Sequence, residues 1–272
     1  MDHPTLPTLK PARAFARSWR LDLALLAFLV VPVLVIGAAR VHASTFNVHP
    51  VRLFLQESAS TTQIELRNDS DETIALQLNA VRWSQGPDGS DVEEATDEVV
   101  FFPRIFQLAP HARKMVRVGL ASAKAPPAER TWRLYMTQLP LDTESGGTQL
   151  RVMLRVGVPI FLAPQKTTLA GAVKGLALDG CKVRFEVANQ GTVQFRPSTI
   201  ALQVFDGVGS EVFSQSQSGS YVLAGNAQRR VFDLPPEVCD KASTVAVHLE
   251  APELKMDQAV LVAPAAKASP PR

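Results

Sequence analysis

The alternation of hydrophobic and polar positions is most regular in residues 150–164, whose sequence is LRVMLRVGVPIFLAP. One parity of this run is aliphatic at five successive positions: Leu150, Val152, Leu154, Val156 and Val158. Because side chains of a strand alternate between its two faces, these residues predict a continuous aliphatic stripe. The stripe is typical of an ordinary half-buried antiparallel strand. It also fits an edge strand that offers the stripe to another protein, because an open edge carries unpaired backbone groups.

Shorter runs with the same two-residue period begin at residue 45 and are separated by turn residues such as the polar run at 68–71. The strands that we expect in this part of the chain are 45–55, 62–68, 74–83, 99–108, 114–120, 131–139 and 150–164. Pro50 interrupts the first of them and favours an edge strand, and the run at 99–108 holds a short strand around Pro103. No run has a convincing helical period. Seven strands in about 120 residues indicate an immunoglobulin-like β-sandwich.

The pattern restarts after residue 166. The expected strands there are 169–178, 182–188, 199–205, 211–214, 229–234 and 244–250. They predict a second, smaller sandwich, so we expect an all-β chain with domains at 44–164 and 165–262. Residues 263–272 (APAAKASPPR) have the composition of a disordered tail.

Residues 1–43 have the pattern of a secretory signal peptide. A basic segment precedes an apolar run at 23–39, and Val41 and Ala43 supply the small residues of a cleavage site. We therefore expect cleavage after Ala43. The alternative is an uncleaved membrane anchor, but the apolar run contains Pro32 and is shorter than the roughly 20 residues that a spanning helix needs.

Charge and cysteine content fit an exported binding protein. Five of the 28 basic and two of the 26 acidic residues lie within 1–43, so the charges of the remaining chain nearly balance. This balance gives no reason to expect nucleic acid or an anionic membrane surface as a partner. The two cysteines, Cys181 and Cys239, predict a disulfide in an oxidising compartment, with two unrelated buried thiols as the alternative.

Signals for catalysis or metal binding are weak. Beyond the signal segment the histidines are His49, His111 and His248, which lack the short spacings of metal ligands. No nucleophile-elbow, phosphate-loop or paired-cysteine motif occurs. We therefore expect no enzyme activity, no cofactor, no metal and no small-molecule substrate. A hydrolase built on a β-sandwich is the least favoured alternative.

Motifs spread over most of the chain resemble those of periplasmic pilus-assembly chaperones, the PapD-like family of the chaperone–usher pathway. In the first domain they are Val48-x-Pro50-x-Arg52-Leu53, Leu66-x-Asn68, Phe106-x-Leu108-x-Pro110, Val116-Arg117-Val118, Glu129-x-x-Trp132-Arg133-Leu134 and Val158-Pro159-Ile160-Phe161-x-x-Pro164. In the second they are Asn189-x-Gly191 and Gly219-x-Tyr221-x-Leu223-x-Gly225. No single motif is decisive, but their order along the chain is fairly specific.

The resemblance implies two immunoglobulin-like domains arranged as an L and a location in the periplasm. It also implies that the chain caps pilus or fimbrial subunits, lending its own strand at 150–164 to an incomplete subunit sandwich until an outer-membrane usher exchanges it. The aliphatic stripe suits this role, because alternate side chains can fill pockets while the main chain pairs. The alternative from another class is a two-domain structural subunit or adhesin.

The family holds the carboxylate at the subunit's C-terminus with two basic residues. Arg52 matches the first of them, whereas the second position is Pro159, which has no charge. This departure suggests a divergent, archaic-type branch in which another cation serves. We expect that cation to be Arg133, with Arg155 as a weaker candidate. Glu129 matches a family acid whose arginine partner corresponds here to Ala163, so the resemblance predicts no ion pair for it.

Overall fold

The computed structural model describes residues 46–141, 152–252 and 254–261. The predicted signal segment 1–43 and the tail 263–272 lie outside the described residues. Within these ranges the chain forms seventeen strands and one short helix, which confirms the all-β fold class. No helix among the described residues is long and apolar enough to cross a membrane.

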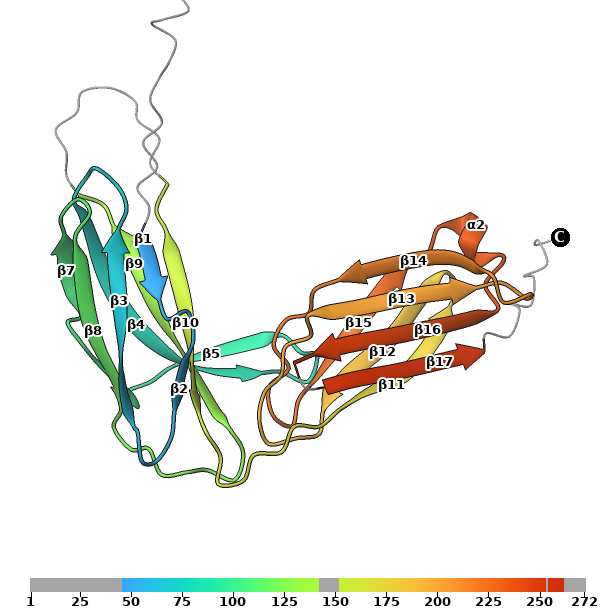
Figure 1. The fold of residues 1–272 in the computed structure, drawn as a ribbon, viewed down its shortest axis with the longest axis horizontal. Coiled ribbons are helices and arrows are strands. Elements are labelled where there is room, and N and C mark those ends of the chain that lie inside the picture. The colour runs from blue at the N-terminus through green and yellow to red at the C-terminus, as the bar shows by residue number, and fades with distance from the viewer. Residues whose placement is uncertain (1–45, 142–151, 253, 262–272) are drawn as a thin grey trace, which may run out of the picture. The chain divides into compact units, whose positions relative to one another are not determined.

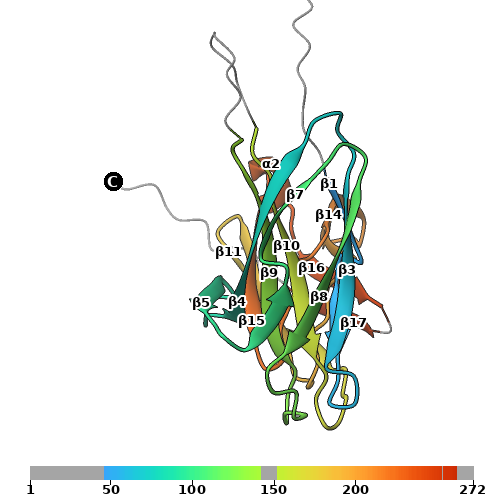
Figure 2. The same ribbon diagram turned by 90° about the vertical axis from the view of Figure 1, so that its left-hand side faces the viewer.

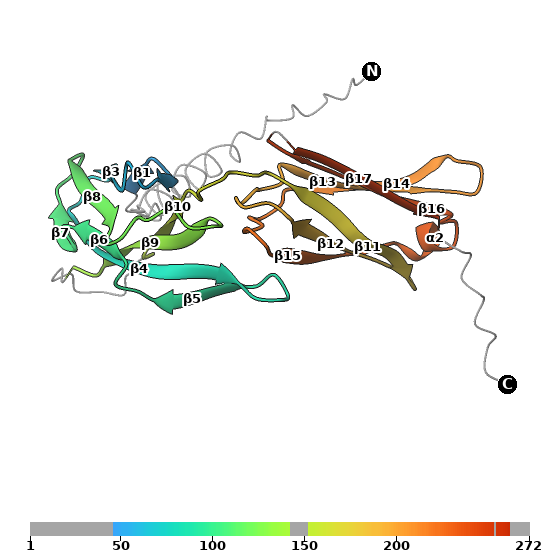
Figure 3. The same cartoon turned by 90° about the horizontal axis from the view of Figure 1, so that it is seen from below.

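Strands β1–β10 form the first sandwich, and Figure 3 shows its two sheets as separate layers. In order across the first sheet, the strands are β1 (Phe46–His49), β3 (Thr61–Asn68), β8 (Arg113–Leu120) and β6 (Val99–Phe102). In order across the second, they are β2 (Leu53–Leu55), β10 (Arg155–Leu162), β9 (Arg130–Leu139), β4 (Ile74–Gln85) and β5 (Asp91–Ala95), and β7 (Ile105–Leu108) also pairs with β4.

Two stretches that we predicted as single strands are each divided between the two sheets. The run at 45–55 gives β1 in one sheet and β2 in the other, with Pro50 between them. The run at 99–108 gives β6 and β7, divided near Pro103. Proline has no N–H to donate to a ladder, so each run leaves its sheet at this position. The interruption expected at Pro50 is thus confirmed, but counting each run as one strand is wrong, and the strand expected around Pro103 is divided there.

The core of the first sandwich lies between its two sheets. Ile64 and Val116 come from one sheet, Leu76 and Leu134 come from the other, and all four are completely buried. Each aliphatic side chain buried in this way contributes about 1.5–3 kcal/mol relative to an exposed one. This core fixes the positions of β9 and β10, which carry most of the candidate site.

Strands β11–β17 form the second sandwich, which has its own core. One sheet contains β11 (Gly171–Asp179), β12 (Lys182–Asn189) and β15 (Ala227–Asp233) in this order. The other contains β14 (Glu211–Gln217), β13 (Thr199–Phe205), β16 (Thr244–Ala251) and β17 (Leu254–Leu261). We did not predict β17. The domain boundary near Pro164 stays a prediction.

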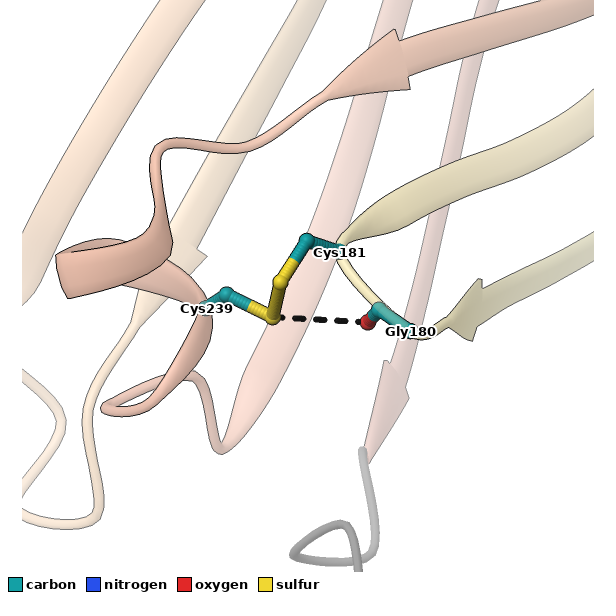
Figure 4. Close-up of a disulfide and its surroundings, with 3 residues drawn as sticks. All are labelled: Gly180, Cys181 and Cys239. Carbon is teal, nitrogen blue, oxygen red and sulfur yellow. Dashed lines mark hydrogen bonds between the residues drawn. A yellow bond between two sulfur atoms is a disulfide. The ribbon is translucent and has the colours of Figure 1, made fainter.

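A disulfide joins Cys181 and Cys239 in the second sandwich, as expected (Figure 4). Cys181 lies in the turn between β11 and β12, and Cys239 ends the short helix α2 (Pro236–Cys239). Their Cα atoms are 5.4 Å apart, a usual separation for a disulfide. The sulfur of Cys239 also lies 3.4 Å from the carbonyl oxygen of Gly180.

Candidate functional site

The two edges of strand β10 differ along its length. On one side β10 pairs with β9 over its whole length, in antiparallel register from Arg155 to Leu162. On the other side β2 pairs with it in parallel, but only over Ile160–Leu162. No described strand pairs with that side of residues 155–159, so this segment is an open edge with backbone groups available to a partner.

The aliphatic stripe runs from exposed to buried toward this edge. Its first described members, Val152 and Leu154, precede β10, so the strand predicted at 150–164 is observed only over Arg155–Leu162. The side chain of Val152 is 62% exposed, whereas Leu154 and Val156 are half-buried and pack against the core. Val158 is only 1% exposed and belongs to the core of the sandwich. Val158 is therefore not accessible to a partner, although its parity is the same. Leu150 lies outside the described residues.

The opposite face of the open edge is covered by an aromatic ring. The guanidinium of Arg155 lies 3.7 Å from the centroid of the Tyr135 ring, a cation–π contact. A Cβ atom on Gly157 would lie 2.7 Å from the same ring, so any larger residue would displace it. A larger residue at position 157 would thus fit only if the Tyr135 ring shifts, and the same ring supports Arg155 at the start of the open edge.

Arg52 lies where the open edge ends. It directly precedes β2, whose first residue, Leu53, pairs with Ile160 of β10. The side chain of Arg52 is exposed, and no carboxylate among the described residues pairs with it. Arg52 thus presents an uncompensated positive charge beside Pro159.

Arg133 lies next to Pro159 on the other side, because these two residues pair between β9 and β10. Its guanidinium forms ion pairs of 2.5 Å with Asp91 and 2.8 Å with Glu93, both on β5. It also lies 3.9 Å from the centroid of the Trp83 ring. Unlike that of Arg52, the charge of Arg133 is already compensated within the chain.

The pKa values of two acidic residues of β5, Asp91 and Glu93, are shifted by their contacts with Arg133 and Tyr135. Burial alone would raise the pKa of both carboxyls. A hydrogen bond from Arg133 holds the pKa of Asp91 below its ordinary value, and hydrogen bonds from Tyr135 and then from Arg133 lower the pKa of Glu93. Tyr135 also donates a hydrogen bond to Glu93. Strand β5, next to β4 at the margin of the sheet in Figure 2, was absent from our predictions. All five of its residues are exposed, so their sequence carries no pattern of burial.

Glu129, which precedes β9, has no ion-pair partner among the described residues. Its carboxylate accepts a hydrogen bond of 3.0 Å from the backbone N–H of Gln194. Burial raises the pKa of Glu129 to about 7, although this hydrogen bond opposes the shift. The described residues also contain no cluster of side chains suited to hold a metal ion.

Comparison with known proteins identifies the first sandwich. Residues 45–168 match the family model described as "Pili and flagellar-assembly chaperone, PapD N-terminal domain". This sandwich is a PapD-like chaperone domain. The resemblance inferred from the sequence motifs is thereby confirmed. No curated protein sequence matches the chain significantly.

Several solved chaperone structures share the fold. One is a chain of the CsuC–CsuE chaperone–tip adhesion subunit complex from archaic Csu pili of Acinetobacter baumannii, with a TM-score of 0.55 and 15% identity over 80% of this chain and 99% of that chain. The YadV chaperone has a TM-score of 0.52 and 13% identity, over 79% and 98% of the two chains. The E. coli chaperone DraB has a TM-score of 0.50 and 15% identity over the same shares.

Proposed function

We propose that this PapD-like chain is a periplasmic chaperone that binds pilus or fimbrial subunits and delivers them to an outer-membrane usher. The observation that carries the proposal is the open edge of β10 with its aliphatic stripe. An extended segment of a subunit can add to this edge through main-chain hydrogen bonds, while the stripe fills the subunit's apolar groove. Its accessible members are Val152, Leu154 and Val156.

The position of β2 favours one direction for the bound segment. Since β2 occupies the same edge from Ile160 onward, a partner strand must end near Arg52. A strand parallel to β10 would bring its terminal carboxylate to this arginine. An antiparallel strand would bring a terminal ammonium, which the guanidinium repels. Charge complementarity therefore supports a parallel segment that ends in a free carboxylate.

Arg133 has a secondary role in this proposal. Its guanidinium is already paired with Asp91 and Glu93, and these two carboxylates would repel a third one, so a partner carboxylate gains less from Arg133 than from Arg52. Arg155 lies at the other end of the open edge and is stacked on Tyr135. We therefore assign the main anchoring contact to Arg52.

The test uses a ten-residue peptide of alternating valine and serine, prepared with either a carboxylate or an amide at its C-terminus. Hydrogen bonds to charged groups contribute about 1.5–3 kcal/mol, so the wild-type chain should bind the carboxylate form at least about tenfold more tightly. Arg52→Ala should bind both forms equally weakly. Isothermal titration calorimetry measures the four affinities.

Arg117→Ala is the matched control, because Arg117 is an exposed arginine on β8 in the other sheet. It should retain the preference for the carboxylate. If Arg52→Ala also retains that preference, the anchoring role of Arg52 is wrong. If no form binds to the wild-type chain, the proposal of strand addition at β10 fails.

A further inference from the structure

We infer that Phe54 forms an apolar subsite beside Arg52 that selects partners by the side chain of their last residue. The favoured side chain is aromatic or a large aliphatic one. This inference rests on the proposed function, since it concerns the same bound segment. It adds a determinant of specificity that the positive charge of Arg52 alone cannot supply.

Phe54 is exposed in a way that its neighbours are not. Leu53 and Leu55, on either side of it in β2, are each 2% exposed, whereas Phe54 is 63% exposed. Its ring stacks on that of Phe161, with centroids 5.3 Å apart and planes inclined by 22°. Phe161 is almost completely buried. One face of the Phe54 ring is therefore supported by the protein, and the ring remains available to an apolar ligand.

The location of Phe54 matches the expected end of the partner. Phe54 pairs with Phe161 in the parallel ladder and lies two residues beyond Arg52. Two residues of a strand span roughly 6.6 Å. A partner whose carboxylate is held at Arg52 thus has its last side chain within reach of the Phe54 ring, if that side chain is large.

The charge distribution around Arg52 makes such an apolar contact more important. Arg133, which lies on the other side of Pro159, is already paired with Asp91 and Glu93. A partner carboxylate therefore meets one uncompensated charge. Any C-terminus offers a carboxylate, so charge cannot distinguish one partner from another. A supported aromatic ring can, because aromatic anchors at the centre of an interface often supply much of its affinity.

The experiment varies the last residue of the peptide and the residue at position 54. The probes are two peptides of alternating valine and serine with free carboxylates, one ending in phenylalanine and the other in serine. The wild-type chain should bind the phenylalanine-ended peptide about tenfold more tightly. Phe54→Ala should lose this preference and bind both peptides as the wild type binds the serine-ended one. Phe54→Leu should retain part of it.

The control is Phe102→Ala, because Phe102 is another exposed phenylalanine, 76% exposed, on β6 in the other sheet. It should keep the full preference, and thermal unfolding should show all three variants folded. If the wild-type chain binds both peptides equally, or if Phe54→Ala keeps the preference, the subsite is wrong while the proposed function stands. If neither peptide binds to the wild type, the proposed function itself fails, and the subsite with it.

Discussion

At the scale of single residues, the pKa of Glu129 is raised far above the ordinary value of a glutamate. A buried carboxylate normally has a cation or several hydrogen-bond donors to offset its lost hydration. Glu129 has one backbone N–H, and its pKa is raised to about 7. The protonated form is therefore favoured in the folded protein below neutral pH. The motifs predicted the missing cation, but burial of the carboxylate depends on residues distant in sequence, such as Gln194.

We predict that this group makes stability depend on pH. An unfolded glutamate titrates near 4.5 and Glu129 in the folded chain near 7, so the folded state binds more protons between these values. The contribution of Glu129 to stability is thus greatest at low pH and falls as pH rises from 4.5 to 7, by at most about 3 kcal/mol. Urea unfolding of the wild-type chain at pH 5 and pH 7.5 should show this decrease, which Glu129→Gln should remove.

Glu72→Gln is the control for that comparison, because Glu72 is an exposed carboxylate in the turn after β3. Its free energy of unfolding should change with pH as that of the wild type does. A decrease of the same size in Glu129→Gln would assign the pH dependence to other groups.

At the scale of elements, the stripe of β10 shows what a sequence pattern can and cannot reveal. The alternation correctly gave the parity of the strand, because only local geometry sets it. It could not reveal that Val152 is exposed and Val158 is in the core, since burial depends on where β2 and the facing sheet end. The ion-pair partners of Arg133 were hidden for a similar reason: they come from β5, which no burial pattern marks.

The gradient of burial along β10 predicts a graded response to aspartate. Val152→Asp should unfold within a few degrees of the wild type, because this side chain is exposed. Leu154→Asp should be folded but less stable, and Val158→Asp should not fold, since it buries an unpaired charge at a cost of several kcal/mol. Differential scanning fluorimetry without any partner measures the melting temperatures of the first two variants, and Val158→Asp should show no cooperative transition.

Binding of the valine–serine peptide with a free carboxylate completes that series. Val152→Asp should fold normally and bind weakly, because its charge would enter an apolar contact. A folded variant that binds as well as the wild type would remove Val152 from the interface. If Val152→Asp does not fold, Val152 packs in its own domain, and this part of the stripe is not a binding surface.

At the scale of the whole molecule, each sandwich has its own large hydrophobic core, and a small third cluster contains Trp83, Phe161 and Leu223. Among the described residues, only the core of the second sandwich has a disulfide packed against it. The bond joins residues 58 positions apart. In the chain-entropy model, closing a loop of this length stabilises by about 4 kcal/mol. The core of the first sandwich has no such covalent support among its described residues.

Removing the disulfide should therefore weaken the second sandwich selectively. Cys181→Ser combined with Cys239→Ser should lower its free energy of unfolding by up to about 4 kcal/mol. Trp132 is buried in the core of the first sandwich, whereas the ring of Trp83 contacts Tyr221 of the second. In the chain cut after Ala43 and carrying Trp83→Phe, Trp132 is the remaining tryptophan, so its fluorescence reports unfolding of the first sandwich, and far-UV circular dichroism reports both sandwiches. In urea, the transition seen by circular dichroism should move to lower concentration while the fluorescence transition moves less. Unchanged stability would contradict a stabilising bond.

Under the proposed function, the short strand β2 also sets a spacing rule for the partner segment that would bind beside it. A segment that must end at Arg52 is measured backward from its own last residue, so the identity of each contact depends on its distance from that terminus. Because strand side chains have a period of two, one residue added at the terminus would turn every apolar side chain to the wrong face. Two added residues would turn the apolar side chains back to the correct face, but each of them would lie two residues further along the edge. A partner is therefore recognised by its spacing as much as by its composition.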